Sequence, residues 1–172
     1  MNSNIQFTPH FALSEFVVSQ TARNHGIKNE PSPEQVENLR ALCIHTLEPL
    51  RHALGLPIII TSGYRCQELN SLLAQHSDKS QHLQGQAADF HIGHTDGTDD
   101  TDHSAVSRRK LLIKAFKTII LDKNINFDQC IIYPNFIHVS YVRSGNNRRK
   151  VLKANGQGSF QALSHYEALS LA

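Results

Sequence analysis

The chain has 172 residues, of which 40% are hydrophobic, and a formal net charge of +2 with the histidines neutral. This length and apolar content suit a single globular domain over residues 1–172 and argue against intrinsic disorder. The charge is too balanced to predict nucleic-acid binding, and no apolar run approaches the roughly 20 residues that a membrane span needs. We expect a monomer.

The N-terminal third is predicted to be helical. Residues 12–24 are expected to form one short helix with Ser14 as its N-cap. A longer helix is predicted over 33–54, because apolar residues recur there at three- and four-residue steps. Pro49 lies inside this span and should kink or divide it, and Gly55 should end it.

Short strands and helices alternate in the rest of the chain. Strands are predicted over residues 57–61, 87–92, 127–133 and 136–142, and helices over 65–75 and 104–121. The last two strands should form a hairpin at Pro134–Asn135. From residue 144 the sequence is weakly patterned and rich in glycine. The order predicts an α+β domain with a small, mostly antiparallel sheet and helices packed on one side.

Two charged segments and the cysteines are interpreted as structural or solvated. Residues 94–103 carry four aspartates and are predicted to be a solvated loop rather than a metal clip. The basic run 148–150 is also interpreted as a solvated loop. Cys43, Cys66 and Cys130 form no CxxC pair, so neither a disulfide framework nor a thiolate metal site is expected. Cys43 and Cys130 lie in apolar runs and should be buried.

The segment 80–89 is the most informative part of the sequence for function. His82 and Asp89 are seven residues apart, which corresponds to roughly 23 Å along an extended strand. Both can therefore bind one ion only if the chain reverses direction between them. Gly85 lies in the middle, where a turn with positive φ would cost little. Zinc binds such nitrogen and oxygen ligands at about 2.0–2.2 Å.

A third ligand could come from His138. In a strand, Ile137 and Val139 would face the core and His138 the opposite side, where a cleft could lie. The spacing leaves other interpretations open. His138 could be a structural histidine with an ordinary hydrogen bond, and His91 shares a strand face with Asp89 and competes for the same role.

The motif SxHxxGxAxD resembles the signature of the M15-type zinc peptidases. It consists of Ser80, His82, Gly85, Ala87 and Asp89. These peptidases include D,D-carboxypeptidases, D,D-dipeptidases and phage L-alanoyl-D-glutamate endopeptidases. Further segments resemble the same family in the same order, namely residues 11–16, 62–65, 127–129 and 136–140. The resemblance runs from about residue 7 to 142 and implies a Hedgehog/DD-peptidase-like fold.

The resemblance also implies roles for individual residues. His82, Asp89 and His138 would bind Zn²⁺ and leave a fourth position for water. Arg65 would lie near the substrate, where a guanidinium can pair with a terminal carboxylate, while the residue alone is equally compatible with a surface salt bridge. Ser80 would hydrogen-bond the substrate or a ligand, or only cap the turn.

The chain departs from the family at the general base. A carboxylate usually precedes the last histidine, but here Asn135 stands three positions before His138, and Tyr133 occupies the other usual place. A tyrosine can donate to an oxyanion but is a poor base at neutral pH. Asp128 would be far from the site unless the sheet curls. The base is therefore unassigned, and the acidic loop 96–102 could also supply it.

The resemblance implies a zinc metallopeptidase that hydrolyses peptide bonds in peptidoglycan stem peptides, as a D,D-carboxypeptidase or an endolysin-type enzyme. Because the usual base is missing, the alternative is a non-catalytic zinc domain that binds cell-wall peptide or a protein partner. A metal-free scaffold with structural histidines is a third hypothesis. Residues 1–6 show no secretory signal, so we expect synthesis in the cytoplasm, with later release to the cell wall as a route to the substrate.

Overall fold

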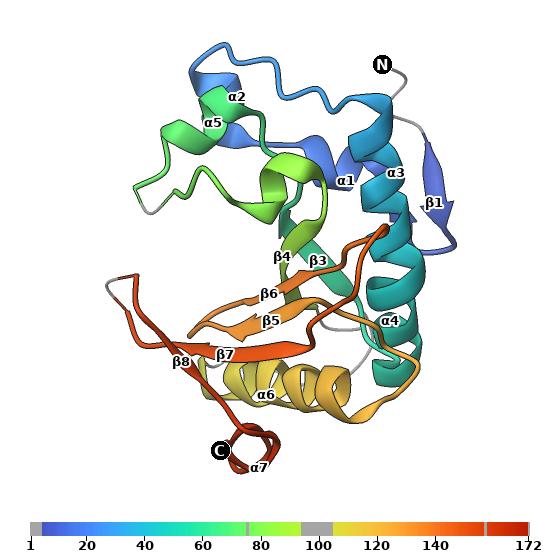
Figure 1. The fold of residues 1–172 in the computed structure, drawn as a ribbon, viewed down its shortest axis with the longest axis vertical. Coiled ribbons are helices and arrows are strands. Elements are labelled where there is room, and N and C mark those ends of the chain that lie inside the picture. The colour runs from blue at the N-terminus through green and yellow to red at the C-terminus, as the bar shows by residue number, and fades with distance from the viewer. Residues whose placement is uncertain (1–4, 75, 94–104, 157, 172) are drawn as a thin grey trace.

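A mixed sheet forms the centre of the protein, whose computed structural model describes residues 5–74, 76–93, 105–156 and 158–171. Within these residues the sheet has the strand order β3-β4-β6-β5-β7-β8 (Figure 1). Its strands are β3 (Ile58–Ser62), β4 (Ala87–Ile92), β5 (Gln129–Ile132), β6 (Ile137–Ser140), β7 (Lys150–Ala154) and β8 (Phe160–Ala162). Neighbouring strands are antiparallel except β5 and β7, which are parallel. The predicted α+β class with a mostly antiparallel sheet is confirmed.

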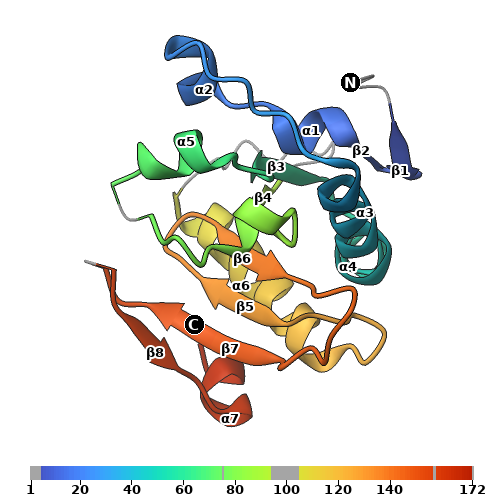
Figure 2. The same ribbon diagram turned by 45° about the horizontal axis from the view of Figure 1, so that its top comes forward.

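Nine helical segments are described along the chain. They are α1 (Leu13–Val17), α2 (Gln20–Asn24), α3 (Pro33–Leu42), the π-helical turn η1 (Cys43–Leu47), α4 (Glu48–Leu54), α5 (Gln67–Ser71), the 3-10 turn η2 (Gln81–Gln84), α6 (Ala105–Leu121) and α7 (His165–Leu169). A small hairpin of β1 (Gln6–Thr8) and β2 (Phe11–Ala12) precedes them. α6 packs against β4 and β5, and α1 lies against β3 (Figures 1 and 2). None of the helices in the described segments is long and apolar enough to cross a bilayer.

The two faces of the sheet differ in character because successive side chains alternate. One face lies in the hydrophobic core and is formed by Ala88, Phe90, Ile92, Cys130, Ile132, Ile137 and Val139. The opposite face carries Asp89, His138, Ile131 and Leu152, which are neighbours in register across β4, β6, β5 and β7. The prediction that His138 faces away from the core is confirmed, and this second face bears the candidate site.

The single helix predicted over 12–24 is wrong. The chain forms α1 and α2 instead, with Val18 and Ser19 extended between them. Ser19 Oγ accepts a hydrogen bond from the Ala22 amide and so caps α2, which favours a new helix start at this point. Ser14 is not the N-cap, because α1 begins after Ala12.

The predicted break at Pro49 takes the form of the π-helical turn η1 within one continuous helical rod. Proline has no amide hydrogen, so the carbonyl of His45 lacks its usual partner in the helix. That carbonyl accepts from the Asn126 amide at 2.9 Å, and the Thr46 hydroxyl donates to the Asn126 carbonyl. The irregular turn therefore attaches the segment before β5 to the helical rod.

Residues 148–150 are exposed, and Arg148 and Arg149 lie in a loop as predicted, but this loop also makes specific contacts and leads into β7. Arg148 pairs with the buried Asp128, and Lys150 begins β7. The Arg149 guanidinium donates to two carbonyls near the end of α6 and lies 4.5 Å from the centroid of the Phe127 ring. These contacts order the C-terminal segment, which forms β7, β8 and α7. The helix predicted over 65–75 is shorter, and the acidic loop with Ser104 lies outside the described residues.

The cysteines match the sequence-based expectation. All three are free, and Cys43 and Cys130 are buried as predicted. Burial raises the pKa of both thiols, with the neighbouring Glu15 adding to the effect at Cys43. Thiols of this kind stay protonated and act as small core side chains.

Gly85 reverses the chain between His82 and Asp89, as predicted. It ends η2 with φ of 66°, in the left-handed region that disfavours other residues. A Cβ built at Gly85 would lie 2.5 Å from the Gln35 carbonyl oxygen of α3. The Gln35 side chain also donates to the Leu83 carbonyl at 2.8 Å. Gly85 is therefore required both for its backbone conformation and for the close approach of α3.

We predict that Gly85→Ala destabilises the fold by more than the roughly 1 kcal/mol that a left-handed alanine costs alone. Gly26 is the matched control, because its φ is also 66° but no atom lies within 4 Å of a Cβ placed there. Thermal unfolding of both variants measures the difference. Equal losses of stability would contradict the role assigned to the contact with α3.

Candidate metal centre

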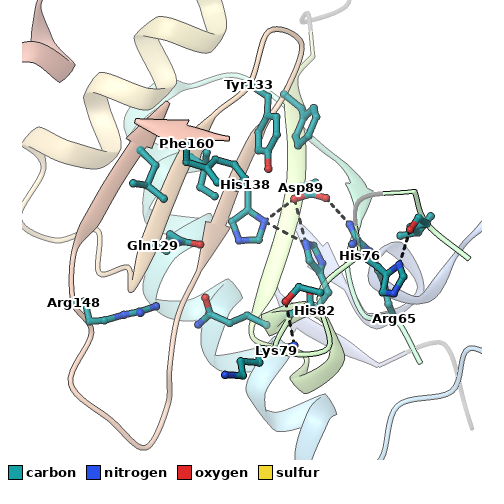
Figure 3. A pocket seen from close by; sticks show the side chains of 17 residues that line it. Arg65, His76, Lys79, His82, Asp89, Gln129, Tyr133, His138, Arg148 and Phe160 are labelled. Carbon is teal, nitrogen blue, oxygen red and sulfur yellow. Dashed lines mark hydrogen bonds and ion pairs between the residues drawn. The ribbon is translucent and has the colours of Figure 1, made fainter. Parts of the chain in front are cut away.

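Three side chains that are distant in the sequence meet on the face of the sheet opposite the hydrophobic core. Asp89 lies on β4, His138 lies opposite it on β6, and His82 projects from η2. His138 Nδ1 is 2.8 Å from Asp89 Oδ1, and His82 Nε2 is 3.2 Å from both of these atoms. Figure 3 shows the three side chains pointing toward one another. The sequence-predicted triad is thus brought together.

The His82 ring is held by the backbone. Its Nδ1 lies 2.6 Å from the Gly63 carbonyl oxygen, to which it donates a hydrogen bond. That bond leaves the Nε2 lone pair directed at Asp89 and His138, the orientation typical of a metal-binding histidine. Gly63 itself packs against Phe16, whose carbonyl oxygen would lie 2.5 Å from a Cβ at this position.

Arg65 holds the Asp89 carboxylate from the side away from the histidines. Its Nη2 donates to Asp89 Oδ2 at 2.8 Å, and its Nε donates to Ser62 Oγ at 3.0 Å. Arg65 does not bond the other carboxylate oxygen, Oδ1, which faces His82 and His138. The guanidinium is largely buried, so the interpretation as a surface salt bridge is wrong. Arg65 therefore orients a candidate ligand, and it also lines the cavity beside the cluster.

The protonation states suit a cation. Burial favours the neutral carboxyl, but His82 and His138 more than offset it and hold the pKa of Asp89 well below its usual range. Burial also lowers the pKa of His82 and outweighs the attraction of Asp89. Near neutral pH the cluster therefore presents a neutral imidazole and a carboxylate, which are the forms that bind metal.

The geometry fits a tetrahedral ion. Ligand atoms about 2.0 Å from zinc at tetrahedral angles are about 3.3 Å from one another, close to the separations of 2.8 and 3.2 Å found here. Two histidines and one carboxylate are also a ligand set common to catalytic zinc sites. The rival His91 lines a different cavity with Arg108 and Arg109 and takes no part in this cluster.

The cluster opens into a cavity of about 540 Å³ (Figure 3). One wall is polar and includes Lys79, Ser80 and Gln81. The Ser80 side chain makes no capping hydrogen bond to η2, so it does not serve only to cap the turn. The apolar part of the lining consists of a floor from the sheet and of aromatic side chains, namely Ile131, Leu152, Tyr133, Phe136 and Phe160.

Tyr133 lies in this cavity with its phenol directed toward the cluster (Figure 3). Its ring stacks on Phe136 at 4.2 Å between centroids. Burial and the charge of Asp89 raise the pKa of Tyr133. The phenol is therefore a hydrogen-bond donor at neutral pH and not a base.

The other positions considered for a base lie elsewhere. Asn135 is exposed at the hairpin turn and lines the cavity that contains His91. Asp128 is buried and accepts hydrogen bonds from Arg148 and from Gln81, and it does not line the cavity. Among the described residues that line the cavity, Asp89 is the only carboxylate.

Sequence reasoning missed several parts of the site. The Gly63 carbonyl left no signal beyond the glycine itself, because its role depends on where His82 lies. Leu152 and Phe160 come from a segment without a recognisable pattern, and they reach the cavity only through the pairing of β7 with β5.

Comparison with protein families gives a match to this chain. A model of the Peptidase M15 family matches residues 9–117, which include His82 and Asp89 but end before His138. A search of curated proteins found no match. The matched segment covers more than half of the chain and contains Arg65, Ser80 and the reversal at Gly85. The chain therefore belongs to the Peptidase M15 family.

Proposed function

We propose that this protein is a zinc-dependent peptidase that hydrolyses peptide bonds in the stem peptides of peptidoglycan. The observation that carries the proposal is the meeting of His82 Nε2, Asp89 Oδ1 and His138 Nδ1 beside an open cavity. Membership of a peptidase family supports hydrolysis as the reaction. Release from the cytoplasm to the cell wall would bring the protein to this substrate.

In the proposed mechanism His82, Asp89 and His138 hold the zinc ion. Zinc in such a site supplies Lewis-acid chemistry, polarising a carbonyl and lowering the pKa of water. Arg65 fixes the carboxylate of Asp89 through Oδ2, so that Oδ1 stays aligned. The Tyr133 phenol donates a hydrogen bond to the substrate oxygen on which negative charge develops.

A second candidate function follows from the missing base. No carboxylate other than Asp89 lines the cavity among the described residues. A positioned general base typically contributes 10²–10⁴-fold to the rate. The chain would accordingly hydrolyse slowly, or it would bind zinc and cell-wall peptide without cutting.

We predict that the protein binds one zinc ion per chain and that zinc raises its melting temperature. His82→Ala should weaken zinc binding by more than about 100-fold, and Arg65→Gln by about 10–100-fold because it only orients Asp89. His91→Ala is the control, since His91 lies on the same strand but lines another cavity. Competition with a chelating dye measures all four affinities, and equal losses for His82→Ala and His91→Ala would refute the ligand set.

We also predict that Tyr133→Glu increases hydrolysis of purified peptidoglycan by at least about tenfold, because a carboxylate there would enter the cavity beside the cluster. Release of new amino groups from cell walls is the measurement. Asn135→Glu is the matched control and should have no effect, since that side chain lies outside this cavity.

The outcome separates the two candidate functions. Wild-type activity that depends on zinc supports the enzyme. Activity that appears only in Tyr133→Glu supports the non-catalytic domain. If zinc is bound and neither protein cuts at any pH, the peptidase proposal fails.

A further inference from the structure

We propose that β7 and β8 provide a substrate-binding subsite in this cleft, with Phe160 as its specificity-determining residue, so that the substrate extends to both sides of the metal centre. This inference rests on the proposed peptidase function. It assigns a role to a segment that lies beyond the family match, which ends at residue 117.

The floor of the cavity continues from the candidate ligands to β7 in a single row. Asp89 pairs with His138, His138 with Ile131, and Ile131 with Leu152. Directly paired residues share a face, because side chains alternate along each strand. The register of the sheet therefore fixes an apolar floor next to the metal centre on the β7 side.

Phe160 stands at the end of this floor. It pairs with Ala154, and the next pair on the same face of the sheet is Leu152 with Ala162. All three residues of β8 are exposed, so this edge strand contributes little to the core. Phe160 nevertheless lines the cavity beside the metal centre, and 47% of the surface of this residue is exposed. Large exposed apolar groups beside a cavity are typical of binding surfaces.

Contacts with neighbouring rings hold Phe160 in place. Its ring meets that of Tyr133 edge-on, at 6.1 Å and 84° between planes. Tyr133 in turn stacks on Phe136. The three rings form an aromatic wall, and Figure 3 shows Tyr133 and Phe160 on the same side of the cluster. A wall ordered in this way can bind a flat apolar group without losing further side-chain freedom.

The side across the cluster is polar and cationic. Lys79 lines it together with Ser80 and Gln81, whereas Arg148 lies on the β7 side of the cluster (Figure 3). A carbonyl placed at the cluster would thus have an apolar substrate group on the Phe160 side and a polar or acidic group on the Lys79 side. Arg65 also lines the cavity, but its Nε and Nη2 are bonded to Ser62 and Asp89 and are not available to bind a terminal carboxylate. The geometry therefore favours cleavage of an internal bond.

The apolar group could be the face of a sugar ring or an aliphatic side chain, which share the same chemistry toward an aromatic wall. Four synthetic probes distinguish these sources and the bond type. They are a stem peptide joined to its muramoyl sugar, the same peptide without the sugar, and a copy of each with the C-terminal carboxylate amidated.

The experiment measures the Kd of each probe for the zinc-loaded protein and locates any cleaved bond by mass spectrometry. Phe160→Ala should weaken binding of the probe that fills the subsite by about tenfold, and Phe160→Trp should restore it. Tyr166→Ala is the control, because Tyr166 is also an exposed aromatic residue, at 81%, but lies on α7 and lines none of the described cavities. Amidation should leave cleavage in place.

Each result bears on the inference. If only the muramoyl probe responds to Phe160→Ala, the subsite binds the sugar, and if both probes respond, it binds a peptide side chain. Equal affinities of wild type, Phe160→Ala and Tyr166→Ala for every probe would overturn the subsite. Cleavage abolished by amidation would overturn the internal bond while leaving the peptidase function intact. Because Kd is measured directly, a protein that cuts nothing still tests the subsite.

Discussion

The pairing of β4 with β6, which places Asp89 opposite His138, is the constraint on which the rest of the site depends. A slip of one residue would turn either side chain into the core, because the faces of a strand alternate. The buried Phe90, Ile137 and Val139 prevent that slip, since it would expose them to solvent. The hydrophobic core thus fixes the position of two candidate ligands whose side chains lie on the opposite face of the sheet.

The third candidate ligand is positioned by different means. His82 lies outside the sheet, on a turn that Gly85 closes and that Gln35 and Asn38 of α3 hold by hydrogen bonds to its carbonyls. Its ring is oriented by the Gly63 carbonyl. The candidate metal centre therefore joins the central sheet to the η2 turn. Glycines at positions 63 and 85 make this junction possible, because they allow neighbouring segments to approach closely.

Local chemistry determined which features could be predicted from the sequence. The β4 strand, the reversal at Gly85 and the outward face of His138 follow from residue type and alternation, and the structure contains all three. The partners of Arg65 and Arg148 could not be predicted, because both depend on tertiary proximity. The parallel pairing of β7 with β5 could not be predicted either. It depends on tertiary proximity, and the segment that leads into β7 is rich in polar residues and has no recognisable pattern. The single helix expected over 12–24 was wrong because Ser19 offers a competing cap.

The most direct test of the account is X-ray absorption at the zinc edge of the zinc-loaded protein. We expect nitrogen and oxygen neighbours only, at about 2.0–2.1 Å, with the multiple scattering of two imidazoles. A sulfur neighbour at about 2.3 Å, or a signal from one imidazole or none, would show that zinc is bound elsewhere and would contradict the assignment of His82, Asp89 and His138.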